Sequence, residues 1–254
     1  MRNIAAWVMF VGSRFHGWQV QRDVVTVAGT LEAALSRLCG HVVKVHGCGR
    51  TDAGVHAERY CFNFFTSSSI PPERFPFALN PLLPPDISLV RAVFAPDDFD
   101  SNMSCIKKEY SYRIFVSRFR DPFFFGRVLF YPLQLDVDAM RLAASHFVGT
   151  RDFAALRSVG SVTRSSVRTV FWFEVDVSGS FVVLRVCADG FLYNMARAMV
   201  GTLIYVSEGK ICPFELPRLL DNGVRCFLGP TVPPDGLFLS RVWYDGVVGE
   251  MMGM

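Results

Sequence analysis

The apolar residues of this 254-residue chain come in short runs that Gly, Pro, Arg or Asp interrupts. A membrane-spanning helix needs roughly 18 to 20 consecutive apolar residues. The sequence therefore predicts no membrane segment, although 51% of its residues are hydrophobic. Residues 1–11 contain one Arg and a short apolar stretch without a small-residue cleavage site, which favours a first β-strand over a signal peptide.

The spacing of the apolar residues predicts both strands and helices. Alternation and β-branched or aromatic content predict strands at residues 3–11, 42–48, 59–66, 87–94, 108–116, 167–177, 181–188 and 237–244. Helical spacing or an N-terminal proline predicts helices at residues 30–38, 72–79, 137–147 and 192–206. Thr30 is the expected N-cap of the first of these helices.

The polar, turn-rich stretch 96–102 divides this series of elements, and a similar order of strands and helices follows it. We therefore expect an N-terminal subdomain at 1–103, a C-terminal subdomain at 104–246 and a flexible tail at 247–254. The expected fold class is α+β, with two similar subdomains that each have a mainly antiparallel sheet backed by helices. The motif Gly-x-Gly-x-x-Gly is absent, which argues against a dinucleotide-binding fold.

The seven cysteines are scattered and none is spaced Cys-x-x-Cys. This usage is typical of a reducing compartment and predicts a cytoplasmic protein without disulfides. The five histidines show no His-x-x-x-His spacing, so we predict no metal site.

The net charge of +3 is a weak indication by itself, but the arginines gather near glycine-containing turns and polar segments. These residues are Arg14, Arg22, Arg50, Arg151, Arg157, Arg164 and Arg168. Arginine is favoured where phosphate is bound through two parallel hydrogen bonds. The pattern therefore indicates a nucleic-acid partner, and the alternative is a solvated surface with ordinary ion pairs.

The segment Gly49-Arg50-Thr51-Asp52-Ala53-Gly54-Val55-His56-Ala57 carries the clearest chemical signal. In a locally extended backbone, Arg50 and Asp52 project to the same side. A guanidinium there would keep the Asp52 carboxylate ionised and oriented for work as a nucleophile, a general base or a stabiliser of positive charge. The alternative is an ion pair that only holds a turn together.

Two further segments can contribute to a site. Strand alternation sends Lys108, Tyr110 and Tyr112 to one face, where a tyrosine could stack on a base or could be an ordinary core residue. In the helix that follows Asp189, Arg197 lies off the apolar stripe, on the face of Tyr193, Asn194 and Gly201. Arg197 is thus a candidate cation for a carboxylate or phosphate, and the alternative is a plain surface arginine.

Together and in this order, these pieces resemble the TruA family of tRNA pseudouridine synthases. The matching segments are residues 12–19, 29–35, 49–57, 108–112, 149–153, 167–170, 191–197 and 236–239. The resemblance covers roughly residues 3–245, and the nine residues around Asp52 match the catalytic signature of the family.

The resemblance implies a pseudouridine synthase-like fold with a central cleft and assigns roles to single residues. It makes Asp52 the catalytic aspartate, Arg50 its signature neighbour, Tyr110 the tyrosine against the target base and Arg197 the arginine that pairs with the aspartate. As further substrate-binding residues we predict Arg14, His16, Lys108 and Arg168.

The implied reaction converts uridine to pseudouridine at positions 38, 39 and 40 in the anticodon arm of tRNA. The family works as a homodimer and uses neither a small-molecule cofactor nor a catalytic metal. Breaking the N1–C1′ bond places positive character on the ribose, which a carboxylate can capture or stabilise. The carboxylate can instead add to C6 of uracil, and the sequence leaves both routes open.

Three positions depart from the pattern of the family. Asn194 stands where His is usual, Asn102 where Arg is usual, and Ala28 where Gln is common. None of them is Asp52, Tyr110 or Arg197, so the expected activity stands. The departures bear on the affinity for tRNA and on whether all three positions are modified.

Three other functions are compatible with parts of the sequence. The chain could be an RNA-binding protein that has lost turnover, or a pseudouridine synthase for other RNA sites. It could also be an aspartate-dependent hydrolase, which would need a metal or a second acid near Asp52. Only His56 and Glu58 in that segment could provide the acid.

Overall fold

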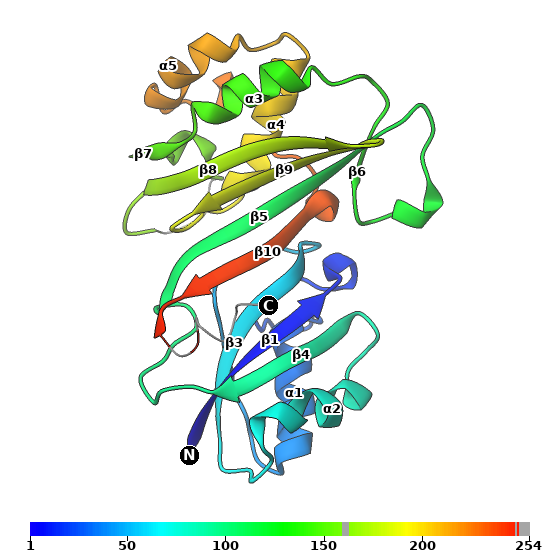
Figure 1. The fold of residues 1–254 in the computed structure, drawn as a ribbon, viewed down its shortest axis with the longest axis vertical. Coiled ribbons are helices and arrows are strands. Elements are labelled where there is room, and N and C mark those ends of the chain that lie inside the picture. The colour runs from blue at the N-terminus through cyan, green and yellow to red at the C-terminus, as the bar shows by residue number, and fades with distance from the viewer. Residues whose placement is uncertain (159–162, 247, 249–254) are drawn as a thin grey trace. The chain divides into compact units, whose positions relative to one another are not determined.

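A computed structural model of the chain describes residues 1–158, 163–246 and 248 (Figure 1). Its contacts form two compact units: unit 1 contains residues 1–108 and the segment from Phe238 onward, and unit 2 contains residues 109–237. The expected subdomains 1–103 and 104–246 stay a prediction. The expected tail, 247–254, lies outside the described residues except for Val248.

Unit 1 has a mainly antiparallel sheet. Its strands are β1 (Arg2–Phe10), β2 (Val45–Gly47), β3 (His56–Thr66), β4 (Ile87–Phe94) and most of β10 (Leu237–Tyr244). The order is β4-β1-β3-β10, and β2 also pairs with β3. Only the β3–β10 pairing is parallel among these.

Two helices, α1 (Val27–Cys39) and α2 (Phe75–Leu79), pack beside each other in unit 1 (Figure 1). The ring of Phe75 in α2 meets Phe64 of β3 edge-to-face, with 5.3 Å between the ring centroids. Both phenylalanines are fully buried. The core of unit 1 thus lies between its sheet and these helices.

Helix α1 begins three residues before the position that its sequence pattern indicated. The side-chain oxygen of Thr26 accepts a hydrogen bond from the Gly29 N–H at 3.2 Å, so Thr26 is the N-cap and the prediction of Thr30 was wrong. Thr30 lies within the helix, and its hydroxyl donates to the Thr26 carbonyl at 3.0 Å. The earlier start also buries Val27 and Ala28.

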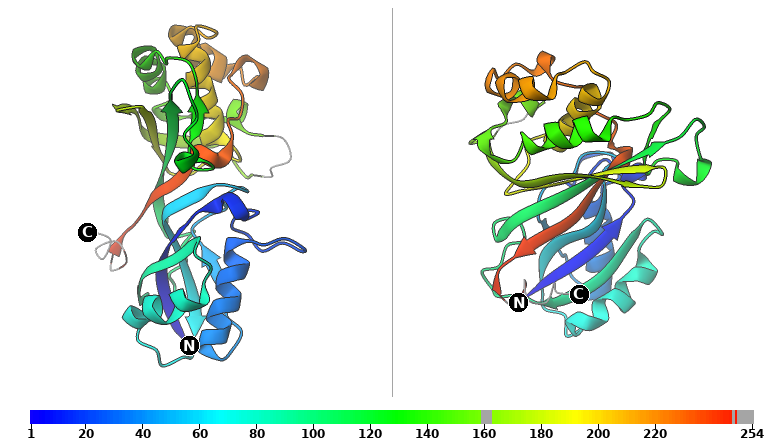
Figure 2. Two further views of the ribbon diagram at one scale, coloured as in Figure 1. Left: turned by 90° about the vertical axis from the view of Figure 1, so that its right-hand side faces the viewer. Right: turned by 45° about the horizontal axis from the view of Figure 1, so that its top comes forward.

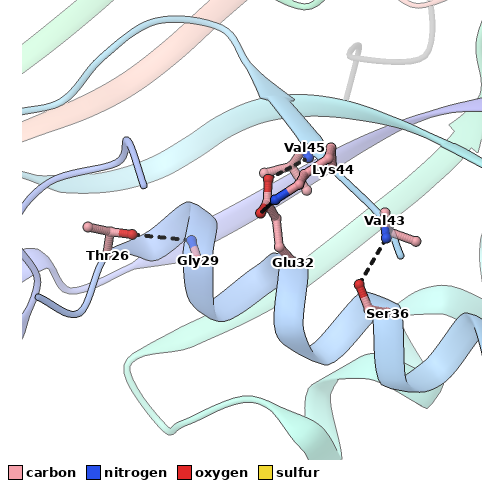
Figure 3. A network of polar contacts seen from close by, with 7 residues as sticks. All are labelled: Thr26, Gly29, Glu32, Ser36, Val43, Lys44 and Val45. Carbon is pink, nitrogen blue, oxygen red and sulfur yellow. Dashed lines mark hydrogen bonds and ion pairs between the residues drawn. The ribbon is translucent and has the colours of Figure 1, made fainter. Parts of the chain in front are cut away.

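Polar side chains of α1 hold the chain that leads into β2 (Figure 3). The Glu32 carboxylate accepts from the Val45 N–H at 3.2 Å, and the Ser36 hydroxyl accepts from the Val43 N–H at 2.9 Å. Because helix side chains take the N–H groups of Val43 and Val45, β2 extends over only Val45–Gly47 instead of residues 42–48.

The strands of unit 2 belong to the same ten-stranded sheet as those of unit 1. Its strands are most of β5 (Cys105–Val116), β6 (Leu129–Tyr131), β7 (Gly149–Asp152), β8 (Val167–Ser178) and β9 (Phe181–Ala188). The order is β5-β9-β8-β7, and β6 pairs in parallel with β5. The predicted hairpin of β8 and β9 is confirmed, with Gly179 in the left-handed region at its turn.

The helices of unit 2 are α3 (Val137–Ser145), α4 (Met195–Ser207) and α5 (Leu216–Asp221). Helices α3 and α4 lie on one side of β8 and β9 (Figure 2). The ring of Phe147, just after α3, packs against Phe173 of β8 at 5.7 Å. Both units therefore confirm the α+β class.

The predicted helix at 192–206 begins later than expected, at Met195, because Asn194 has a left-handed backbone with φ +62°. Gly201, which the sequence places off the apolar stripe of this helix, is buried. A Cβ on Gly201 would lie 1.8 Å from the carbonyl oxygen of Pro230, so this face of α4 packs directly on another backbone segment. Among the described residues, no helix is both long and apolar enough to cross a membrane.

The Thr26 cap gives a first prediction. Thr26→Ala should lower the free energy of unfolding by about 1 kcal/mol, because the Gly29 N–H loses its acceptor. The matched control, Thr30→Ala, should change it by less than about 0.5 kcal/mol. Urea unfolding followed by tryptophan fluorescence measures both, and a larger loss in Thr30→Ala would contradict the assignment.

Candidate active site

Asp52 lies in unit 1, in the loop between β2 and β3. Asp52 is half-buried, whereas Arg50 is exposed and Thr51 is buried. The Val55 N–H donates to the Asp52 carbonyl at 3.2 Å, and Gly54 between them has φ +81°. The chain therefore makes a tight turn directly after Asp52, for which glycine is the suitable residue.

The segment 12–18 fixes this loop through its backbone. The Gly54 N–H donates to the carbonyl of Phe15 at 3.3 Å, and the Trp18 N–H donates to the carbonyl of Thr51 at 3.2 Å. One bond lies on each side of Asp52 along the chain. The two motifs that were separate in the sequence thus form one interlocked unit.

The interlock requires glycine at two positions of the first motif. A Cβ on Gly12 would lie 1.9 Å from the carbonyl oxygen of Val55. A Cβ on Gly17 would lie 2.4 Å from the carbonyl oxygen of Thr51, and Gly17 also has φ +81°. Backbone atoms cannot move aside as the end of a flexible side chain can, so larger residues would separate the two segments.

Aromatic residues anchor the start of the loop. The Tyr60 hydroxyl donates to the carbonyl of Gly49, and the Tyr60 ring stacks on Trp18 with 4.0 Å between the centroids. Tyr60 is fully buried in β3 and Trp18 is 5% exposed. The first residue of the signature is therefore held by the core.

His56 has a structural environment. It is fully buried, its Nδ1 accepts from the Gly12 N–H at 2.9 Å, and its ring stacks on Phe238 at 4.6 Å. These contacts tie the end of the loop to segment 12–18 and to β10, and they argue against His56 as the acid of a hydrolase. No group of three or more His, Cys, Asp or Glu that could hold a metal ion occurs in the part of the chain that the structure describes.

Cys48, directly before the signature, is a poor nucleophile. Burial raises the pKa of the Cys48 thiol to about 11, and the nearby positive charge of Lys108 offsets this only in part. Because the thiolate is the reactive form, burial disfavours the reactive state of this cysteine at neutral pH. Of these two residues, Asp52 is the candidate nucleophile.

Three of the predicted binding residues of unit 1 differ in their surroundings. The Lys108 ammonium lies 3.0 Å from where a Cβ on Gly49 would be, next to the start of the loop. The Arg14 Nε donates to the Asp86 carboxylate at 2.6 Å in an exposed pair. His16 is exposed. Exposed ion pairs contribute only about 0–1 kcal/mol, so phosphate can compete for Arg14.

Tyr110 and Tyr112 of β5, both in unit 2, have different environments. Tyr110 is half-buried and meets Phe191 edge-to-face, with centroids 4.9 Å apart. Tyr112 is buried and its hydroxyl donates to the carbonyl of Pro233 at 2.8 Å, and its burial raises the pKa of the phenol. Tyr112 is therefore a core residue, and Tyr110 is the candidate for contact with a base.

Arg197 lies in the first turn of α4, also in unit 2. Its Nε donates to the carbonyl of Val232 and its Nη1 to the side-chain oxygen of Asn194, both at 2.7 Å. The guanidinium is therefore held in a defined plane, as binding of a carboxylate or phosphate in two parallel bonds requires.

Arg168 of β8 is held by its own strand and the turn before it. Its Nη1 donates to the carbonyls of Ser165 and Val167 at 2.9 and 2.6 Å. A Cβ on Gly190 would lie 3.2 Å from the Arg168 Nε. Gly190 thus gives this side chain room beside the segment that leads to Phe191.

The structure groups the predicted residues by unit. Unit 1 holds Arg14, His16, Arg50, Asp52 and Lys108, and unit 2 holds Tyr110, Arg168 and Arg197. Sequence reasoning missed the roles of Tyr60 and of Asn194. Only the recurrence of glycines in segment 12–17 could have indicated the close backbone contacts.

The interlock gives a second prediction. Gly12→Ala should lower the free energy of unfolding by roughly 1–3 kcal/mol, because its Cβ meets the Val55 backbone. Gly49→Ala is the matched control from the signature, since its Cβ meets only the movable Lys108 ammonium. Amide exchange at Gly54 should accelerate in Gly12→Ala alone, and equal exchange in both variants would refute the interlock.

Comparison with known proteins connects this geometry to a family. A family model described as tRNA pseudouridine synthase matches residues 6–102 and 143–245. The tRNA pseudouridine synthase A of Caldicellulosiruptor bescii is 41% identical over 96% of this chain and 100% of the relative. That of Acetivibrio thermocellus is 40% identical over the same shares.

A solved structure of a Cbf5-Nop10-Gar1 complex covers 93% of this chain and 48% of its own, at 12% identity and a TM-score of 0.40, which is too low to bear on function. The family match includes the interlocked loop of Asp52 and the helix of Arg197, and the chain therefore belongs to the tRNA pseudouridine synthase family.

Proposed function

We propose that this chain isomerises uridine to pseudouridine at positions 38, 39 and 40 in the anticodon arm of tRNA, with Asp52 as the nucleophile. The observation that carries this proposal is the loop of Asp52. Hydrogen bonds from segment 12–18 hold its backbone on both sides of the carboxylate, in a chain that belongs to the family. A fixed nucleophile loses little freedom when it reacts, which lowers the barrier.

The reaction is balanced within one nucleotide. The N1–C1′ bond breaks, the uracil turns, a C5–C1′ bond forms, and C5 loses a proton while N1 gains one. The Asp52 carboxylate can capture C1′ of the ribose or add to C6 of the uracil. Either route needs one carboxylate and neither consumes a co-reactant.

Tyr110 and Arg197 have separate roles in this proposal. The target base must leave the helical stack at a cost of a few kcal/mol. The half-buried Tyr110 ring, braced edge-to-face by Phe191, can stack on that base. The resemblance to the family assigns Arg197 to the catalytic carboxylate, and the hydrogen bonds to Val232 and Asn194 hold its guanidinium in a defined plane.

Contacts to phosphates can offset the cost of extracting the base. We assign these contacts to Arg14, His16, Lys108 and Arg168, with Arg50 as the signature neighbour of Asp52. Residue 102 is Asn where the family usually has Arg. Its side-chain oxygen accepts from the Lys108 ammonium at 3.5 Å. Lys108 can therefore supply positive charge in the region where the family usually has an arginine.

The chain also acts as a cytoplasmic homodimer in this proposal. Exposed phenylalanines in the segment after β5 support the dimer: Phe119, Phe123 and Phe125 are 72%, 82% and 88% exposed. Large exposed apolar groups that lie close together mark protein interfaces.

The catalytic proposal predicts product at defined positions. The purified protein should form pseudouridine in unmodified tRNA transcripts with U38, U39 or U40, mapped by chemical labelling. Asp52→Asn keeps the shape of the side chain but loses its charge, so it should bind the same transcripts and form no product.

Absence of product at all three positions with the wild-type protein would disprove the proposed function. Turnover by Asp52→Asn near the wild-type rate would remove Asp52 from its role. Product at other uridines alone would favour the alternative of a synthase for different RNA sites, and tRNA binding without product would favour a protein that has lost turnover.

The dimer can be tested separately. The wild-type protein should have the mass of two chains in sedimentation analysis, and Phe123→Asp with Phe125→Asp should reduce it to one. Phe77→Asp, at a phenylalanine of α2 that is 75% exposed, is the matched control and should leave the mass unchanged. A monomeric wild-type protein would contradict the proposal.

A further inference from the structure

We infer that Asn194 is a positioning residue whose side-chain amide sets the orientation of the Arg197 guanidinium. The inference rests on the proposed function, which places Arg197 in the active site. It also gives a physical role to a position where the sequence departs from the usual histidine of the family.

The backbone of Asn194 is unusual. Among the described non-glycine residues, only Asp23 and Asn194 have a positive φ, and that of Asn194 is +62°. Asparagine tolerates this conformation better than most residues. The Asn194 carbonyl accepts from the Ala198 N–H at 2.9 Å, so Asn194 is the N-cap of α4.

The side chain of Asn194 does not do what an N-cap side chain normally does. An asparagine at this position usually accepts from a backbone N–H of the first helical turn. Asn194 makes no such bond, and its oxygen accepts from Nη1 of Arg197 at 2.7 Å instead. The helix start thus gives up a favourable cap, and the guanidinium gains a charge-assisted hydrogen bond.

The direction of the amide follows from its neighbours. A guanidinium only donates, so the Asn194 oxygen must face Arg197. The Asn194 Nδ2 then donates to the Ser158 hydroxyl oxygen at 2.9 Å. The Ser158 N–H donates to the carbonyl of Tyr193 at 3.2 Å. Both ends of the amide are therefore held, so it can orient a neighbour.

The other contact of Arg197 is part of the backbone. Its Nε donates to the carbonyl of Val232. Residues 229–230, just before Val232, pack directly on α4. The Gly229 N–H donates to the Thr202 hydroxyl at 3.1 Å, and a Cβ on Gly201 would collide with the Pro230 carbonyl. Side-chain substitution cannot remove a backbone carbonyl. Of these two acceptors, Asn194 is the one that mutation can test.

Loss of the Asn194 side chain should therefore act on the chemical step. Asn194→Gly accepts the same φ without strain and removes the amide. We expect the single-turnover rate of pseudouridine formation to fall about ten- to a hundredfold, as is typical of a misplaced catalytic group. The Kd for tRNA and the thermal midpoint should stay close to wild type. Asn194→Asp keeps both the oxygen and the tolerance of positive φ, and it should restore a rate within about threefold of wild type.

A double-mutant cycle separates positioning from a general structural effect. In an Arg197→Lys background, Asn194→Gly should change the remaining rate by less than about twofold, because the guanidinium that Asn194 orients is gone. A full and additive loss in that background would overturn the inference. So would a wild-type rate in Asn194→Gly, or a loss in Asn194→Asp as large as in Asn194→Gly.

A readout without activity distinguishes this inference from the proposed function. The Arg197 Nε–Hε signal in ¹⁵N NMR should show an ordered group in the wild-type protein and a mobile one in Asn194→Gly. If the wild-type protein forms no pseudouridine but this difference is present, the proposed function fails and the positioning role stands. If the signal is equally ordered in both proteins, the positioning role is wrong whatever the activity.

Discussion

The structure of unit 1 around Asp52 depends on one contact, the backbone interlock between segment 12–18 and the Asp52 loop. Hydrogen bonds from main-chain groups cost no side-chain entropy when they form, and they cannot be displaced by a change of rotamer. These hydrogen bonds also require the two backbone segments to lie close together, which explains why positions 12 and 17 are glycine. A polar loop with a half-buried carboxylate can be rigid here because its neighbours are backbone atoms and buried aromatic rings.

Arg197 is held in a different way. Two of its acceptors are the carbonyl of Val232 and the side-chain oxygen of Asn194. The left-handed backbone of Asn194 resembles that of Gly17 and Gly54 near Asp52, since both give the chain a local conformation that positions a functional group.

Sequence patterns gave the bounds of a strand where both of its ends are marked by turn residues nearby in the sequence. Strands at 87–94 and 237–244 have the predicted bounds, because alternation and turn residues mark both ends. Several errors occur where a side chain outside the element decides where it begins or ends. Strand β2 is short because Glu32 and Ser36 of α1 accept from the N–H groups of Val45 and Val43, at and before its start. Helix α4 starts late because the backbone of Asn194 is left-handed and its side chain bonds Arg197 and Ser158. The short elements β6, β7 and α5 carry too few residues to show a period.

By itself, the sequence determined the α+β class, the likeness to a family of RNA-modifying enzymes and the loop that carries the candidate carboxylate, Asp52. These follow from periodicity and from the order of short motifs, both of which are properties of the chain read in one dimension. Only the tertiary structure decided that Tyr112 is a core residue while Tyr110 is half-buried, that His56 supports the loop, and that Asn194 holds Arg197. The physical reason is that burial and hydrogen-bond partners depend on residues far apart in the chain, such as Tyr112 and Pro233, which are 121 positions apart. The spacing of residues along the sequence does not indicate these contacts.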